Sequence, residues 1–334
     1  MTITKRVPIT LIKSSEIQQN FSISEAINAM EEAFSSLSSG KSFVPQRYVS
    51  TIAQGKLNLL LKPAEFAVKK RATIKILTQK EMGAFHGIPA IVGVVLVIDT
   101  ETGEILSIMD GEYLTALRTG AASGLATNYF AREDAETVAV FGCGAQGKTQ
   151  LEAVMAVRKI NKAFVFDNNE FAAKKFILEM EPKLNINIEI AGSNEVLKEC
   201  DVICTATNSE SPLFFKEHLK GGVHINAIGS YKPNMQEIAP DVLQKAKIFV
   251  DQHDACLSES GDLIKPIAEG YFSAAHIHGE IGDYLLNKID GRITENEITV
   301  FKSVGVAIQD FMVANQIYEK ALKSSFGQSI CLFE

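Results

Sequence analysis

Apolar residues recur at helical spacing near the start of the chain and at strand spacing directly afterwards. Residues 24–40 predict an amphipathic helix, with Ser22 or Ser24 as its N-cap and Gly40 at its end. Its apolar face would carry Ala26, Ile27, Met30, Ala33, Phe34 and Leu37. Short apolar runs follow at 56–61, 71–78, 90–99 and 104–111, separated by Gly, Pro, Asp and Thr. These runs predict an antiparallel or mixed sheet.

A second pattern begins after a helix of small residues at 115–130 and a polar break at 131–136. Strands are predicted at 137–142, 163–167, 186–191, 201–207, 223–229 and 247–251. Helices are predicted between them at 147–157, 169–180, 194–200 and 214–219, with further helical segments between about 256 and 290. Such alternation is typical of a doubly wound parallel sheet.

The last predicted helix, 297–324, is long and mostly apolar, and we expect it to return the chain to the first part. The fold class is therefore α/β, a Rossmann-type doubly wound parallel sheet plus an α+β domain. The predicted boundaries give one domain of residues 1–125 and 311–334, discontinuous in sequence, and a Rossmann domain of residues 126–310.

Composition narrows the class of protein. The 334 residues are 46% hydrophobic and 22% charged, as in globular proteins of about two domains. The net charge of −7 argues against a nucleic-acid-coating role, which needs a basic face. No apolar run is long enough for a signal peptide or a membrane span, so we expect a cytoplasmic protein without membrane partners. The scattered cysteines, Cys143, Cys200, Cys204, Cys256 and Cys331, predict reduced structural thiols, and no metal site is expected.

A glycine motif follows the apolar strand at 137–142 and precedes a helix. Gly142, Gly144 and Gly147 form G-x-G-x-x-G, in which Ala145 and Gln146 would present backbone N–H groups. The first glycine permits a tight turn, the second a close approach to a pyrophosphate, and the third close packing of helix on strand. The motif in this context predicts a dinucleotide site, although a glycine loop can also be an ordinary turn.

Asp167 ends the second strand of this domain, 20 residues beyond Gly147, where the motif expects an acid for the ribose hydroxyls. An acid there disfavours a 2′-phosphate, and Asn168 and Asn169 follow instead of a cation. The predicted cofactor is therefore NADH, with NADPH as the alternative. Thr205 and Thr207 end the fourth strand, where they would meet the cofactor or serve as ordinary strand residues.

Several stretches together resemble the ornithine cyclodeaminase and mu-crystallin family, which also contains archaeal-type alanine dehydrogenases and ketimine reductases. They are PQR (45–47), IK (74–75), DGEYLTALRTGAAS (110–123), FGCGAQG (141–147), INAIGSYKPNMQEI (225–238) and FKSVG (301–305). TALRT and FKSVG are specific, whereas many dehydrogenases share the glycine motif. The resemblance implies that residues 1–125 and 311–334 bind substrate and form a homodimer.

The resemblance also implies roles for individual residues. Arg47, Lys75 and Arg118 would bind the substrate carboxylate, and Val304 would lie near the substrate. Around the cofactor it places Arg118, Thr119, His224, Ile225, Asn226, Ala227, Ser230, Pro233 and Ser303.

The residues themselves support the cationic positions. Arg118 and Lys75 stand among apolar or small neighbours, where an unpaired charge is costly to bury, so each needs an anionic partner. The alternative is that each lies at a rim or pairs with an acid such as Asp110.

Two positions depart from the cyclodeaminases of the resembling family, in which acids handle the substrate amine. At the two positions where the cyclodeaminases have these acids, this chain has Leu60 and Ser230. Leu60 stands before a Lys-Pro pair, where the cyclodeaminases have Met-Pro. A buried ammonium without a carboxylate is disfavoured, and the serine form resembles members that reduce cyclic ketimines. The predicted reaction is therefore NAD(P)H-dependent reduction of Δ1-pyrroline-2-carboxylate to L-proline, and of Δ1-piperideine-2-carboxylate to L-pipecolate as a further substrate.

Three other functions stay open. They are alanine dehydrogenation with pyruvate and ammonia, ornithine cyclodeamination, and a non-catalytic crystallin-like role in ligand binding. For the reductase, Ser230, acting directly or through water, and Lys75 are the candidate catalytic residues that supply the proton. A serine in a Gly-Ser-Tyr turn can equally be a turn residue.

Overall fold

The computed structural model describes residues 7–80 and 91–332. The start of the N-terminal segment, for which no signal peptide is expected, therefore lies outside the described residues. The chain divides into two compact units, Met1–Arg118 with Ala307–Glu334 and Thr119–Val306. The division falls inside helix α3 (Gly111–Phe130) and directly before helix α10 (Ala307–Ser324), slightly earlier at each crossing than the predicted boundaries at 125/126 and 310/311.

A mixed sheet forms the centre of the first unit, in the order β16-β1-β7-β6-β5-β4-β2, with β3 paired to β4. Its members are β1 (Ile9–Ile12), β2 (Ser42–Phe43), β3 (Tyr48–Ile52), β4 (Leu57–Phe66), β5 (Arg71–Lys80), β6 (Ile91–Asp99), β7 (Ile105–Asp110) and β16 (Gln328–Ile330). The β1–β7 pair is parallel and the other pairs are antiparallel. The predicted antiparallel or mixed sheet is confirmed as mixed.

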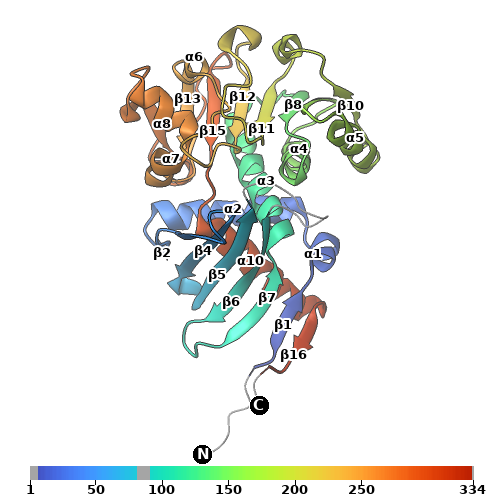
Figure 1. Ribbon diagram of the computed structural model, residues 1–334, viewed down its shortest axis with the longest axis vertical. Helices are drawn as coiled ribbons and strands as arrows, with labels where there is room; N and C mark the ends of the chain where they lie inside the picture. The colour runs from blue at the N-terminus through green and yellow to red at the C-terminus, as the bar shows by residue number, and fades with distance from the viewer. Residues whose placement is uncertain (1–6, 81–90, 333–334) are drawn as a thin grey trace, which may run out of the picture. The chain divides into compact units, whose positions relative to one another are not determined.

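Helices cover one face of this sheet because their apolar stripes need a partner. Helix α1 (Ser14–Asn20) precedes α2 (Ile23–Ser38), which begins at a capping box: Ser22 Oγ accepts from Glu25 N at 3.2 Å, and the Glu25 carboxylate accepts from Ser22 N at 2.9 Å. Helix α10 packs across β4, β5 and β6 and against α2 (Figure 1). A short 3-10 turn, Ala67–Lys69, joins β4 to β5. Side chains on the inner face of β4 and β5 are thereby buried beneath α10.

The second unit is built on a wholly parallel sheet with the order β10-β9-β8-β11-β12-β15-β13-β14. Its strands are β8 (Thr137–Phe141), β9 (Lys162–Phe166), β10 (Asn187–Ile190), β11 (Val202–Thr205), β12 (His224–Ala227), β13 (Ala246–Val250), β14 (Ile277–Glu280) and β15 (Ile298–Lys302). Alternate residues of the central strands enter separate apolar cores, as with Val138 and Val140 on one side and Ala139 and Phe141 on the other. The sheet is the predicted doubly wound one, with its carboxyl ends at one edge.

Helices and 3-10 turns connect these strands (Figure 1). The helices are α4 (Ala145–Val157), α5 (Glu170–Leu184), α6 (Pro240–Leu243), α7 (His253–Glu259), α8 (Gly261–Ala268) and α9 (Ile281–Leu285). The 3-10 turns are Asn194–Lys198, Lys216–His218 and Ala274–His276. The helices predicted at 194–200 and 214–219 are therefore wrong in type. No helix of the described residues is long and apolar enough to cross a membrane.

The predicted helix at 297–324 is wrong in its first part. Residues Ile298–Lys302 form β15, which lies between β12 and β13, and the helix begins only at Ala307. Periodicity did not separate the two elements because β15 is buried on both faces and continues directly into an apolar helix. Gly305, at φ +80°, turns the chain between them.

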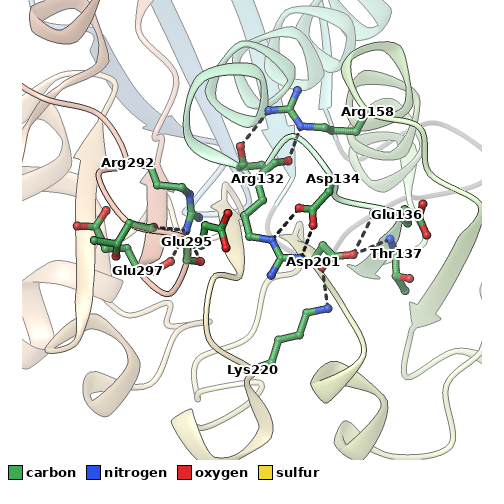
Figure 2. Close-up of polar contacts among 12 residues, drawn as sticks. Arg132, Asp134, Glu136, Thr137, Arg158, Asp201, Lys220, Arg292, Glu295 and Glu297 are labelled. Atoms are coloured by element: carbon green, nitrogen blue, oxygen red, sulfur yellow. Dashed lines mark hydrogen bonds and ion pairs between the residues drawn. The ribbon is translucent and has the colours of Figure 1, made fainter.

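Charged side chains fix the opposite, amino edge of the parallel sheet (Figure 2). Arg158 donates to the carbonyl oxygens of Thr127, Asn128, Ala131 and Arg132 at 2.8–3.0 Å, which satisfies the end of α3. Asp201 accepts from the backbone N–H groups of residues 136 and 137, at the start of β8, and pairs with Lys220 at 2.7 Å. These contacts serve the structure of the amino edge, whereas ligands of such sheets bind at the carboxyl edge.

Candidate functional site

The glycine turn follows β8 at the carboxyl edge of the parallel sheet. Gly142 has φ +95°, which favours glycine, and its N–H donates to Phe166 O at 2.8 Å. A Cβ at Gly147 would lie 1.9 Å from Gly142 O, so only glycine lets α4 approach the turn. Gly144 caps α4 in an extended conformation, and a Cβ there would meet nothing within 4 Å. The start of α4, with Ala145 and Gln146, thus has open space for an anion to approach its N–H groups.

Asp167 lies beside this turn, as the spacing predicts. Its Oδ2 accepts from Cys143 N and its Oδ1 from Asn169 N, both at 2.8 Å. The carboxylate is only partly buried, and each oxygen keeps a lone pair for a further donor. Asn168 and Asn169 are exposed. Turn, helix start and acid therefore fit the phosphates and a ribose of a dinucleotide.

Glu237 joins three loops at the same edge, and sequence reasoning missed it. Its buried carboxylate accepts from Thr205 Oγ1 at 2.7 Å, Thr207 N at 2.6 Å, Thr207 Oγ1 at 2.7 Å and Gly229 N at 2.8 Å. Burial, and then the nearby Asp262, raises the pKa of the Glu237 carboxyl. The hydroxyls of Thr205 and Thr207 are thus engaged with Glu237, and the loops after β11 and β12 are held together.

Ser230 belongs to this buried network. Its hydroxyl donates to Met235 O at 3.1 Å and accepts from Asp262 N at 3.2 Å. Asp262 also accepts from the backbone of residues 237 and 238 and pairs with Lys302 Nζ at 3.0 Å. The side chain of Ser230 is fully buried and holds the turn, which favours a positioning role over proton transfer.

The FKSVG loop after β15 is held by a second buried acid. Asp251 Oδ2 accepts from Ser303 Oγ at 2.7 Å, Val304 N at 3.0 Å and Gly305 N at 2.8 Å. Ser303 and Val304 are both buried at the carboxyl edge. Asp251 is a second residue that the sequence analysis did not single out, although an acid at the end of the apolar strand predicted at 247–251 was the available signal.

The remaining predicted cofactor residues are spread over the second unit. His224 and Ile225 begin β12, at the amino edge, and the His224 ring contacts Thr299 Oγ1 at 2.9 Å and Asn226 Oδ1 at 3.2 Å. Burial lowers the pKa of His224 to about 3, so the ring is neutral. Asn226 donates to Thr127 Oγ1 at 2.9 Å inside the second unit. The contacts of Asn226 and of the His224 ring indicate a structural role for both.

Three further predicted cofactor residues lie elsewhere in the second unit. Ala227 ends β12, and Pro233 is exposed. The Thr119 carbonyl accepts from Gln150 Nε2 at 3.3 Å.

A cationic cluster occupies the first unit. Lys75 of β5 donates to Asp310 Oδ1 at 2.7 Å and to Thr115 Oγ1 at 3.1 Å. Arg118 of α3 donates through Nε to the same Asp310 oxygen at 3.0 Å and through Nη1 to Gln309 Oε1 at 2.6 Å. Among the described residues, no hydrogen-bond partner is found for Asp310 Oδ2. The expected pairing with an acid is thus present, but the acid is Asp310 of α10 and the positive charges outnumber it.

Arg47 and Lys62 complete this cluster. The charges of Arg47 and Lys75 both act on Lys62, Arg47 also acts on Lys75, and Asp310 acts on Lys62 with the opposite sign. Burial lowers the pKa of Lys75 to about 8, while Asp310 opposes the shift. Lys62 was not predicted as a site residue, although a lysine within the apolar run of β4 was a signal for one. Asp310, which pairs with Lys75 and Arg118, was also not predicted, although an acid inside an apolar helix was a signal for it.

Together the fold and its two sites define a class of protein: a two-unit α/β protein with a Rossmann-type glycine turn in one unit and a buried cationic cluster in the other. Comparison with known proteins is more specific. Residues 9–325 match the model of the ornithine cyclodeaminase/mu-crystallin family, and the chain belongs to this family.

Three relatives are similar along nearly their whole length. A Delta(1)-pyrroline-2-carboxylate reductase of Bacillus cereus is 37% identical over 322 residues, 96% of this chain and 99% of the relative. The structure of the Thermococcus litoralis Delta(1)-pyrroline-2-carboxylate reductase with NADH and L-proline is 36% identical, with a TM-score of 0.93 over 96% of this chain and 100% of that one. An archaeal alanine dehydrogenase dimer with bound NAD is 34% identical, with a TM-score of 0.90 over 97% and 99% of the two chains.

Proposed function

We propose that the protein is an NADH-dependent reductase of cyclic ketimines, which converts Δ1-pyrroline-2-carboxylate to L-proline. The six-membered Δ1-piperideine-2-carboxylate, which gives L-pipecolate, is proposed as a second substrate. The observation that carries the proposal is the buried pair of cations Lys75 and Arg118 on one carboxylate, Asp310, with the partly buried Arg47 adding positive charge that acts on Lys75. Such an excess of buried positive charge needs an anion, and every member of this substrate class has a carboxylate.

The proposed substrate site holds the carboxylate by charge and by directed hydrogen bonds. Arg118 is fixed by Asp310 and Gln309, and Lys75 by Asp310 and Thr115, so both cations are oriented before a ligand arrives. Preorganised donors spend little entropy on binding, which favours accurate placement of the imine carbon. The place of Val304 near the substrate, which the family resemblance implies, stays a prediction.

The absence of an ammonium-binding acid at two positions supports a ketimine over ornithine. Leu60 of β4 is apolar, and the Ser230 hydroxyl is already engaged with Met235 and Asp262. A diamine acid would leave its second ammonium without a carboxylate at these places, which is unfavourable in a buried site. A cyclic imine has no such group.

We propose that the Gly142–Gly147 turn binds the cofactor pyrophosphate and that Asp167 binds the adenosine ribose. The open approach to the start of α4 and the partly exposed Asp167 carboxylate support NADH, with NADPH disfavoured by the acid. NADH would supply the hydride that reduces the imine carbon. The loops tied by Glu237 and Asp251, with Thr205, Thr207, Ser230 and Ser303, would shape the nicotinamide pocket.

The proton for the imine nitrogen is proposed to come from the cationic cluster. Lys75 of this cluster has a pKa of about 8, which shows that a lysine there can exchange a proton near neutral pH, so the cluster is a better source of the proton than Ser230. The buried Ser230 hydroxyl is proposed to fix the turn after β12 instead.

Alanine dehydrogenation is the second candidate because the archaeal relative is an alanine dehydrogenase of similar identity. Pyruvate also has a carboxylate for Arg47, Lys75 and Arg118, and its imine with ammonia is an open-chain analogue of the ketimine. The ring carbons of the ketimine form an apolar surface that pyruvate lacks. The two candidate substrates therefore differ in the apolar contacts that they would make with the site.

We also propose a cytoplasmic homodimer. Exposed apolar side chains on β2 and β3 support a docking face on the first unit: Phe43, Tyr48, Val49 and Ile52 are 65%, 58%, 49% and 41% exposed. The archaeal relative is described as a dimer. All five cysteines are free, which is usual in a reducing compartment.

The test is one panel of initial rates with NADH and NADPH. The substrates are the two ketimines, pyruvate with ammonia, and ornithine with NAD. The proposal predicts that kcat/KM is largest for Δ1-pyrroline-2-carboxylate with NADH. Faster ammonia-dependent reduction of pyruvate would favour alanine dehydrogenase, and tight NADH binding without turnover of any substrate would reject an enzyme of this type.

A further inference from the structure

Lys62 lies directly opposite Lys75 in the β4–β5 ladder. Opposed residues of an antiparallel pair project from the same face of the sheet, with Cβ atoms about 4.5–5.5 Å apart. Both lysines are buried, Lys62 with 6% and Lys75 with 1% of its surface exposed. Two lysines side by side under a helix are costly when both are charged, and this arrangement needs an explanation that carboxylate binding by Lys75 alone does not give.

Charged groups face Lys62 from four directions. They are Lys75 of β5, Arg47 of the segment between β2 and β3, Arg118 of α3 and Asp310 of α10. Burial lowers the pKa of Lys62 well below its ordinary value, the three cations lower it further, and Asp310 opposes them. Lys75 and Arg118 pair directly with Asp310, and Arg47 adds further positive charge that acts on Lys62, so an arriving anion favours the charged form of Lys62.

Lys75 has a different set of constraints. Two of its three N–H groups are directed at Asp310 Oδ1 and Thr115 Oγ1, and Asp310 holds its charge. These contacts suit a fixed ligand of the substrate carboxylate. Lys62 instead lies opposite Lys75 in the ladder and is followed by Pro63. This position lets Lys62 exchange a proton with a group bound at Lys75.

We propose that Lys62 takes up a proton when the substrate carboxylate joins the cluster and then delivers this proton to the imine nitrogen. The inference deepens the proposed function and rests on it. Lys75 is then the anchor of the carboxylate, and Lys62 is the acid.

The step balances as follows in the direction of reduction. The imine carbon accepts a hydride, the electron pair of the C=N bond moves to nitrogen, and the nitrogen forms a bond to the proton released by the Lys62 ammonium. NADH is oxidised to NAD⁺, the imine is reduced to an amine, and Lys62 is left neutral. A proton from solvent restores the ammonium when the next substrate binds.

The first test measures proton uptake without turnover. Pyrrole-2-carboxylate, a flat ring carboxylate with no imine carbon to reduce, is titrated by calorimetry in two buffers of different ionisation enthalpy at pH 7, below the pKa of about 8 of Lys75, so that Lys75 is already mostly charged. We expect uptake of up to one proton per site in the wild type, and loss of most of this uptake in Lys62→Met, which keeps the length of the side chain. Lys174→Met, an exposed lysine of α5, is the matched control and should retain full uptake. Unchanged uptake in Lys62→Met would overturn the proposal.

The second test follows kcat against pH with Δ1-pyrroline-2-carboxylate. Loss of a general acid costs roughly 10²–10⁴-fold, so we expect kcat of Lys62→Met to fall at least about 100-fold at pH 8 with a smaller change in KM. The deficit should shrink at low pH, where the ketimine is already protonated in solution. A purely structural role would give a deficit that does not vary with pH, which contradicts the proposal.

Two controls keep the outcomes separate. Lys62→Gln, a second variant, must show the same pH-dependent deficit, and NADH binding shows that either variant is folded. An active wild type with full kcat in both variants rejects the role of Lys62 and leaves the proposed function intact. A wild type that oxidises no NADH with the ketimine rejects the proposed function and the delivery step with it.

Discussion

Lys75 and Asp310 form a buried ion pair at 2.7 Å although 235 positions separate them in sequence. The return of the chain through α10 brings Asp310 onto the inner face of β5, where the same carboxylate oxygen also accepts from Arg118. This one acid allows two cations to be buried in the first unit while leaving the cluster positive overall. The candidate substrate site thus depends on a residue that has no direct part in anion binding.

Replacement of Asp310 by asparagine tests this dependence. Removing one partner of a buried ion pair typically costs about 3–5 kcal/mol because the other charge stays buried. We therefore expect Asp310→Asn to lower the free energy of unfolding by about that amount, measured by urea denaturation at pH 7. Glu195→Gln, which breaks the exposed pair with Lys198, should leave the midpoint nearly unchanged. Equal midpoints for the wild type and Asp310→Asn would contradict the assigned role.

The affinity for substrate should depend on pH through Lys75. Its pKa in the folded protein is lowered to about 8, so the side chain loses its charge as pH rises through 8, while the substrate keeps its carboxylate. KM for the ketimine should therefore rise between about pH 8 and 10. Lys75→Arg retains a charge over this range and should flatten the rise, and KM for NADH, measured in parallel, provides the internal control. A ketimine KM that is constant from pH 7 to 10 would argue against carboxylate binding by a charged Lys75.

The same lowered pKa of Lys75 affects protein stability in the opposite direction: substrate affinity falls as pH rises, whereas the free energy of unfolding rises. A lysine with a lowered pKa in the folded state binds fewer protons there than in the unfolded chain between about pH 8 and its ordinary value of 10.5. The contribution of Lys75 to the free energy of unfolding should thus become more favourable as pH rises through this window. The comparison of the wild type with Lys75→Met by urea denaturation at pH 7.5 and 10 isolates this contribution, and a stability difference that is independent of pH would contradict it.

Gly144→Ala tests the dinucleotide site without disturbing the fold. Gly144 has φ −82°, and a Cβ at this position would meet no atom within 4 Å, so alanine is sterically acceptable in the free protein. In the proposed complex the methyl group would occupy the path of the pyrophosphate. We expect the melting temperature to stay within about 2 °C and the Kd for NADH to rise at least about 10-fold, measured by fluorescence. Gly192→Ala, equally open in the same unit, is the control. Equal affinity in both variants would place the pyrophosphate elsewhere.

Asp167 is expected to set the choice between NADH and NADPH. Replacement by serine removes the charge that repels a 2′-phosphate and the acceptor for the ribose hydroxyls. The ratio of kcat/KM for NADH to that for NADPH should fall about 10- to 100-fold in Asp167→Ser. The Asp134→Ser variant, at an exposed acid of the amino edge, should keep the wild-type ratio. A ratio that does not change in Asp167→Ser would exclude it from cofactor recognition.

The parts of the fold with local signals could be predicted from the sequence. The glycine turn and Asp167 follow from a fixed spacing after buried strands, and Ser22 marks the start of α2 through a capping box. The β15–α10 segment could not be divided correctly, because a strand buried on both faces and a buried helix are both continuous apolar runs.

The candidate site was predictable only in part for a similar reason. Arg118 and Lys75 were recognised as cations in apolar surroundings, but their partner Asp310 is supplied by α10, a distant segment of the chain. Lys62 stands out only once the β4–β5 register is known, since that register sets it opposite Lys75. Long-range pairing of this kind leaves no spacing in the sequence for a pattern to detect.

The most direct measurement is the transfer of label from NADH that carries deuterium at both hydrogen positions of C4 during reduction of Δ1-pyrroline-2-carboxylate. The account predicts one molecule of L-proline per NADH oxidised, with deuterium at the carbon that bears the carboxylate. Failure to form proline, or proline without deuterium at that carbon, would contradict the proposed reaction.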